Sequence, residues 1–129
     1  MSEYVIDAYA WIEYLDGTEK GKIVKEIIES QENKIYTNII TIAELASIFT
    51  RKRYNLEECK NSIFPLTNFY KIDVDFAEEA GKLHAEIKQE RKHISMADVM
   101  VLLTARKLKA KLLTGDEDFR GLKEVIMIK

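Results

Sequence analysis

Short apolar runs alternate with amphipathic stretches along the whole chain. Residues between the runs carry apolar side chains three or four positions apart, a spacing typical of helices with one buried face. Regular alternation of strands and helices predicts a mostly parallel sheet covered by helices on both faces, a three-layer α/β/α sandwich. The five expected strands lie at residues 4–6, 34–37, 71–74, 111–114 and 124–127.

Residue types also predict where the helices begin and end. Gly17 should break the helix that follows the first strand, and the next helix presents Ile23, Ile27 and Ile28 on one face. Pro65 should kink or end a later helix. The expected helix starts are near Thr41, for a helix running towards Arg53, and at the capping residues Asn55, Asp75 and Ser95, the last opening an apolar helix to about Leu108.

Length and composition narrow the class of protein. A chain of 129 residues with 47% apolar residues is expected to form one globular domain, residues 1–129. No apolar run approaches the ~20 residues that span a bilayer, and the first residues lack the basic and apolar regions of a signal peptide. A single cysteine excludes an intrachain disulfide and fits a reducing cytoplasm, while one Cys and two His argue against a closed zinc site.

Four acidic residues stand where the predicted strands end or helices begin. Asp7 follows the first strand, Asp116 follows the fourth, and Glu44 and Asp98 are expected in the first turns of two helices. In open parallel sheets these positions meet at one edge, where ligand sites form outside the carboxyl ends of the strands. The connectivity therefore predicts that four carboxylates converge.

Each acid has a simpler explanation as a helix cap. Thr41 and Ser95 each precede an acid by three residues, the capping pattern, and Asp7 and Asp116 could cap helices directly. Taken together, however, several carboxylates about 5 Å apart repel by about 3 kcal/mol per pair at an effective dielectric of 20, so they need a cation or a proton. Oxygen-only ligands favour Mg²⁺ or Mn²⁺.

The chain carries a formal charge of −2, which argues against a surface that grips nucleic acid everywhere. If metal neutralised the four acids, the rest of the chain would carry a net positive charge. A local basic patch could then still hold a phosphate backbone. The densest basic cluster is Arg51, Lys52 and Arg53. These residues are candidate RNA contacts, or simply cations placed favourably at the end of a helix.

Four segments, in this order, resemble the motifs of the PIN domain, in particular the toxins of VapC type. Together they cover nearly the whole chain. Each motif alone is short, and the specificity lies in their ordered combination with the final Thr-Gly-Asp-x-Asp-Phe. The segments are Val5-Ile6-Asp7, Thr41-Ile42-Ala43-Glu44-Leu45, Ile94-Ser95-Met96-Ala97-Asp98 and Leu113-Thr114-Gly115-Asp116-Glu117-Asp118-Phe119.

The resemblance implies a five-stranded α/β/α fold and a metal-dependent endoribonuclease that hydrolyses phosphodiester bonds with metal-activated water. Asp7, Glu44, Asp98 and Asp116 occupy the family's four acidic positions and would hold Mg²⁺ or Mn²⁺, with Glu44 as a ligand or water orienter. Further matches are Asp118, a more variable extra acid, and Thr114, a hydroxyl that often supports the site. One departure is Tyr9, where the family often has Ser or Thr.

The same resemblance implies partners. An RNA substrate, an antitoxin protein that blocks the acidic cleft, and a second copy of the chain in a homodimer are expected on that basis, with no membrane. A non-catalytic Mg²⁺-binding module of receiver type is an alternative, but it would want adjacent acids after the first strand, where this chain has only Asp7. A structure-specific DNA nuclease is another alternative, but this chain lacks the helical arch that such enzymes usually carry.

Overall fold

The computed structural model describes residues 2–128 and contains one five-stranded sheet. Its strand order is β3-β2-β1-β4-β5, and all four pairs of neighbouring strands are parallel. The prediction of a mostly parallel sheet is thus confirmed. The strands are β1 (Ser2–Ile6), β2 (Asn33–Asn38), β3 (Asn68–Tyr70), β4 (Lys111–Thr114) and β5 (Val125–Met127).

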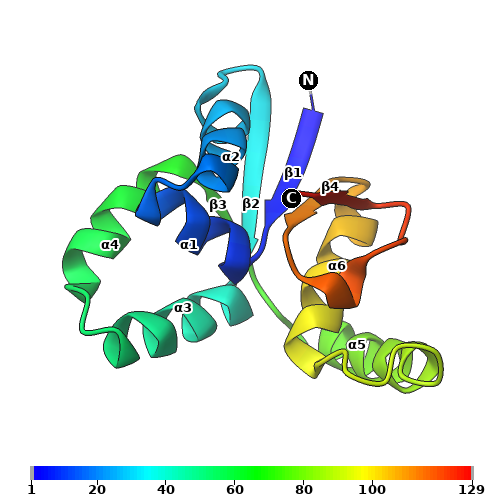
Figure 1. The fold of residues 1–129 in the computed structure, drawn as a ribbon. Helices are drawn as coiled ribbons and strands as arrows, with labels where there is room; N and C mark the ends of the chain where they lie inside the picture. Colours follow the sequence, from blue (N-terminus) through cyan, green and yellow to red (C-terminus); the bar gives the residue numbers. More distant parts are fainter. Residues whose placement is uncertain (1, 129) are drawn as a thin grey trace.

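Six α-helices connect these strands and form the outer layers. Figure 1 shows α1 to α4 on one side of the sheet and α5 and α6 on the other, the predicted three-layer sandwich. The bounds are α1 (Ala8–Asp16), α2 (Glu19–Glu29), α3 (Ile39–Arg51), α4 (Leu56–Ile63), α5 (Val74–Ile87) and α6 (Met96–Leu108), with 3₁₀ turns η1 (Phe64–Leu66) and η2 (Glu117–Phe119). None of the helices in residues 2–128 is long and apolar enough to cross a membrane.

Successive residues of the central strands face opposite layers, which is why these strands are apolar throughout. Ile6 of β1 and Leu113 of β4 pack with the core under α1 to α4, around the fully buried Trp11. Val5 and Leu112, one position earlier, pack instead in a second core that α6 covers. The sheet therefore separates two hydrophobic cores and holds both helical layers in register.

The prediction for the third strand is wrong. The sequence predicts it at residues 71–74, whereas β3 lies three residues earlier, at Asn68–Tyr70. The Asp73 side chain accepts a hydrogen bond from the Phe76 backbone N–H at 2.8 Å and caps α5. Asp73, and not the expected Asp75, therefore begins this helix, and Val74 becomes its first residue, 73% exposed.

The start of α3 also differs from the prediction. The helix begins at Ile39 and not near Thr41, because Asn38 caps it by accepting a hydrogen bond from the Ile40 N–H at 2.8 Å. The Asn38 amide also donates to the Thr104 hydroxyl of α6 at 2.8 Å, a contact between the end of β2 and α6. As a result, Glu44 lies in the second turn of α3, where Thr41 cannot serve as its capping partner.

The strand order places β1 and β4 side by side in the middle of the sheet. The chain moves outward from β1 to β2 and β3, then returns to lay β4 on the other side of β1. The carboxyl ends of β1 and β4 are therefore adjacent, with connections leading away in opposite directions. This is the switch point at which open α/β sheets form their ligand sites.

Gly21 allows α2 to pack closely on α1. A Cβ atom at this position would lie 2.0 Å from the Glu13 backbone carbonyl oxygen, so a side chain would have to displace backbone. Gly81, in the middle of α5, has no atom within 4 Å of the corresponding position. The two helical glycines thus differ only in what surrounds them.

We expect Gly21→Ala and Gly81→Ala to change stability in opposite directions. Overpacking against α1 should make Gly21→Ala destabilising by about 1–3 kcal/mol, although alanine favours helix. Gly81→Ala should be stabilising by about 0.5–1 kcal/mol, because it lowers the entropy of the unfolded chain without a clash. Urea unfolding of the two variants measures both changes, and equal effects would contradict the close packing of α1 and α2.

Candidate functional site

Asp7 is the most deeply placed of the candidate acids. It follows β1 directly and caps α1, accepting a hydrogen bond from the Ala10 N–H at 2.8 Å, and it is only 7% exposed. Burial raises the pKa of this carboxyl to about 7. Hydrogen bonds from Thr114 and Ala10 oppose that rise, and the nearby charges of Asp116 and Asp98 add to it.

The turn after β4 carries two further acids. The Thr114 hydroxyl donates a short hydrogen bond to Asp7 Oδ2, and its oxygen accepts one from the Asp116 N–H at 3.0 Å. Asp116 in turn caps η2 by accepting a hydrogen bond from the Asp118 N–H at 2.9 Å. One threonine thus joins the ends of β1 and β4, and a single turn presents both Asp116 and Asp118.

Asp98 enters the site from the first turn of α6. Ser95 caps the helix by accepting from the Asp98 N–H at 3.0 Å, and Asp98 Oδ2 accepts from the Ser95 N–H at 3.1 Å. This reciprocal capping box is the one predicted from the sequence. Burial raises the pKa of Asp98, the bonds from Ser95 lower it, and Asp116 and Asp118 raise it again.

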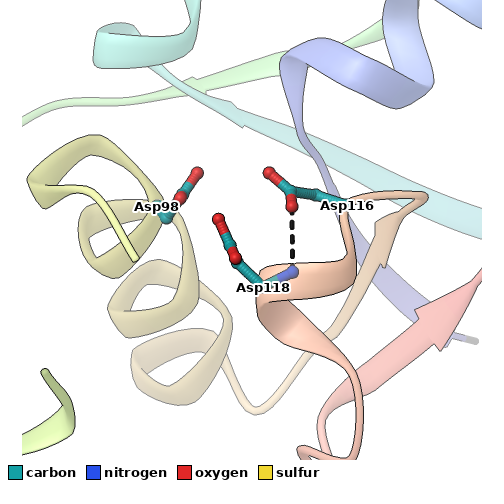
Figure 2. A group of neighbouring side chains, drawn as sticks. All are labelled: Asp98, Asp116 and Asp118. Carbon is teal, nitrogen blue, oxygen red and sulfur yellow. Dashed lines mark hydrogen bonds between the residues drawn. The ribbon is translucent and has the colours of Figure 1, made fainter. Parts of the chain in front are cut away.

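Asp98, Asp116 and Asp118 form a compact group of three carboxylates. One oxygen of each lies within 4.8 Å of those of the other two. Figure 2 shows the three side chains converging, Asp98 from α6 and the other two from the turn after β4. Asp118, expected only as a variable extra acid, therefore lies as close to a shared position as Asp98 and Asp116 do.

Glu44 approaches the same group from α3. Burial raises the pKa of its carboxyl, and the charges of Asp98 and Asp116 raise it further. Three segments far apart in the sequence, α3, α6 and the turn after β4, therefore bring acids to the edge that Asp7 occupies behind them. Of the four predicted acids, Asp98 and Asp116 belong to the compact group. Asp7 and Glu44 lie outside it, close enough for its charges to raise their pKa values, and the chemical roles of all four stay predictions.

The five acids have no cationic partner in the part of the chain that the structure describes. Within residues 2–128, none of the six ion pairs includes Asp7, Glu44, Asp98, Asp116 or Asp118. Like charges at this density are unfavourable without a cation or bound protons. A set of carboxylate oxygens with no competing Lys or Arg suits a hard divalent cation such as Mg²⁺ or Mn²⁺.

The basic cluster at residues 51–53 lies away from the acids. These residues end α3 about two helical turns beyond Glu44, and the Lys52 ammonium lies 4.0 Å from the Asp16 carboxylate. Contact of Arg51, Lys52 and Arg53 with RNA stays a prediction. A cation that the sequence did not single out, Arg91, donates to the Asp118 backbone carbonyl at 2.9 Å and so supports the turn at η2.

Tyr9 explains why a glycine stands between Thr114 and Asp116. A Cβ atom at Gly115 would lie 2.2 Å from Tyr9 Cε1, so the tyrosine ring packs directly on this part of the turn. The Tyr9 hydroxyl accepts a hydrogen bond from the Lys20 ammonium at 3.2 Å. No local pattern marks this contact, because it depends on how α2 packs on α1.

We expect the buried Asp7 to make the metal-free protein less stable as pH rises. Its pKa is about 7 in the folded chain and near 3.8 when unfolded, so between these values the folded state binds the extra proton. The free energy of unfolding should therefore fall as pH increases from about 4 to about 7. Asp7→Asn should flatten this dependence, measured by urea unfolding in EDTA.

Asp75→Asn provides the matched control for that measurement. Asp75 is an exposed acid in the first turn of α5, outside the cluster, so its variant should keep the wild-type slope. If the free energy of unfolding depended on pH equally in Asp7→Asn and Asp75→Asn, this would contradict a raised pKa for Asp7.

Several solved structures have a fold similar to that of this chain. A toxin–antitoxin complex from Klebsiella pneumoniae has a chain that is 23% identical, with a TM-score of 0.75 and 98% of both chains covered. VapC20 of Mycobacterium tuberculosis, described as a sarcin-ricin loop cleaving toxin, is 14% identical, with a TM-score of 0.74 over 93% of this chain and 95% of that one.

VapBC-1 from nontypeable Haemophilus influenzae is 19% identical, with a TM-score of 0.73 and 98% of each chain covered. At these identities the likeness establishes the fold alone. A search of curated proteins gave no match. The model of the PIN domain family matches residues 4–125, from the first strand to the last. Because that match spans nearly the whole length, the chain belongs to the PIN domain family.

Proposed function

We propose that this protein is a metal-dependent endoribonuclease and the toxin of a toxin–antitoxin pair. The observation that carries the proposal is the group formed by Asp98, Asp116 and Asp118, whose oxygens lie within 4.8 Å of one another without an ion-pair partner in residues 2–128. Membership of the PIN domain family supports nuclease activity at this edge of the sheet. RNA as the substrate rests on the resemblance to VapC toxins.

Each acid has a separate task in this proposal. Asp98, Asp116 and Asp118 would hold the ion. Asp7, predicted as a further ligand, uses one oxygen to cap α1 and the other to accept from Thr114, and so would fix the turn. Glu44, which lies close enough to Asp98 and Asp116 to feel their charges, would act as a further ligand or orient the attacking water. A bound Mg²⁺ or Mn²⁺ would supply an activated water and offset charge on the scissile phosphate.

The two alternative functions, a receiver-type module and a DNA nuclease, are not equally well supported. A receiver-type module is disfavoured, because receiver domains have strand order 2-1-3-4-5 and this sheet has 3-2-1-4-5. A DNA nuclease could use the same acids, so the choice of RNA over DNA needs a direct test. Cleavage by water leaves 5′-phosphate and 3′-hydroxyl ends, whereas attack by a 2′-hydroxyl would leave a cyclic phosphate.

A protein antitoxin is the expected partner. The similar structures from Klebsiella pneumoniae and Haemophilus influenzae are toxin–antitoxin complexes, which supports an antitoxin for this chain. A homodimer and a cytoplasmic location, both expected from the sequence, stay predictions.

We expect wild-type protein to cleave a mixed RNA pool with Mg²⁺ or Mn²⁺ and Asp98→Asn to be at least about 100-fold slower. Asp75→Asn, which removes an exposed acid from another helix start, should cleave like wild type. Sequencing of the product ends should give 5′-phosphates, and matched single-stranded DNA should remain intact. Equal rates for wild type and Asp98→Asn would refute the catalytic assignment, and faster cleavage of DNA would refute the choice of substrate.

Divalent metal should stabilise the protein through the same acids. At about 100 times its dissociation constant an ion that binds only the folded state contributes about 2.7 kcal/mol, enough to raise Tm by several degrees. Asp98→Asn should lose most of the metal-dependent rise, because a neutral amide is a poorer ligand and the charge of the group falls. Thermal unfolding with and without Mn²⁺ measures this, and an equal rise in wild type and variant would contradict a metal site at Asp98.

A further inference from the structure

Tyr9 contacts the turn that carries Asp116, and Lys20 is bonded to Tyr9. The Tyr9 ring lies on Gly115, whose two neighbours are Thr114, bonded to Asp7, and Asp116. The ring therefore covers the turn that presents the acids. A larger residue at position 115 would push it away, so this placement is built into the turn.

Lys20 is held at the hydroxyl end of that ring. Its ammonium donates to the Tyr9 hydroxyl at 3.2 Å and lies 5.8 Å from the ring centroid, so it lies beyond the hydroxyl and not over the face of the ring. The backbone of Lys20 is fixed as well, because it directly precedes Gly21, the residue in closest contact with α1. The hydrogen bond to Tyr9 positions a side chain that is otherwise flexible.

Both groups keep unused hydrogen-bond donors. In residues 2–128, Lys20 forms no ion pair, so of its three N–H groups only the one directed at Tyr9 has a partner. The Tyr9 hydroxyl accepts from Lys20, and the described residues offer no acceptor for its own proton. Several donors, one of them charged, therefore lie together at a half-exposed position.

A phosphate group is the ligand that such a set of donors suits. Its oxygens accept several hydrogen bonds, and bonds from an ammonium to a phosphate are stronger than those between neutral groups. The neighbouring acids repel a nucleic-acid backbone, so a cation at their border would offset part of that repulsion. The cluster at residues 51–53, at the far end of α3, is less well placed to do so.

We infer that Tyr9 and Lys20 bind an RNA phosphate next to the bond that is cleaved. The Lys20 ammonium offsets the charge of the phosphate, and the Tyr9 hydroxyl donates a hydrogen bond to it. This inference rests on the proposed ribonuclease function and adds a substrate-binding pair to it. Contacts with phosphate position the strand without reading its sequence. The pair therefore serves affinity for RNA of any sequence.

The test measures cleavage of a short unstructured RNA in Mn²⁺ over a series of salt concentrations. Lys20→Gln should raise KM roughly tenfold, leave kcat within about twofold, and reduce the slope of log(kcat/KM) against log salt by about 0.7, the loss of one phosphate contact. Lys20→Arg, which keeps the cation, should restore the slope. Tyr9→Phe, which removes only the hydroxyl, should raise KM roughly fivefold with an unchanged slope.

Lys25→Gln is the matched control. It removes the same charge from an exposed position on the same helix and should behave like wild type. A Lys20→Gln protein with the KM and salt slope of Lys25→Gln would overturn the inference, even if its Tm fell, because a purely structural tether would leave the slope unchanged. A wild type that cleaves no RNA would instead overturn the proposed function, and this inference with it.

Discussion

The arrangement of this molecule depends on holding several carboxylates together with no ion-pair partner among residues 2–128. Three of the acids accept hydrogen bonds from backbone N–H groups at the start of a helical segment: Asp7 at α1, Asp98 at α6 and Asp116 at η2. These bonds, with the positive end of the helix dipole, partly offset the repulsion. Capping and ion binding are therefore compatible explanations, because the bonds that begin α6 and η2 also hold Asp98 and Asp116 within one compact group.

The order of the parallel strands brings these acids together at one end of the sheet. β1 and β4 are neighbours in the sheet although they are more than a hundred residues apart, and the Thr114 hydroxyl bridges their ends to Asp7. The two cores on either side of the sheet fix the orientation of α3 and α6, which supply Glu44 and Asp98. Structural stability and the site thus share the same edge, and the buried charge there is a cost that a bound cation would relieve.

Much of this could be predicted from the sequence, because strand alternation and acid placement are local patterns. Sheet class, the capping box at Ser95 and the convergence of four acids followed from them. Two boundaries did not. The starts of α3 and α5 depend on Asn38 and Asp73, and the β-branched or alternating residues after them resemble strand. The Asn38 contact with Thr104, 66 residues away, has no local signal, and neither does the Lys20 contact with Tyr9.

The missing side chain at Gly115 has an evolutionary consequence. Since the Tyr9 ring occupies the space that a Cβ atom would need, positions 9 and 115 are not independent. A side chain at position 115 would displace the Tyr9 ring, so it is better accommodated where a smaller residue replaces Tyr9. The two positions should therefore co-vary, and substitutions at one should be tolerated or rejected according to the residue at the other.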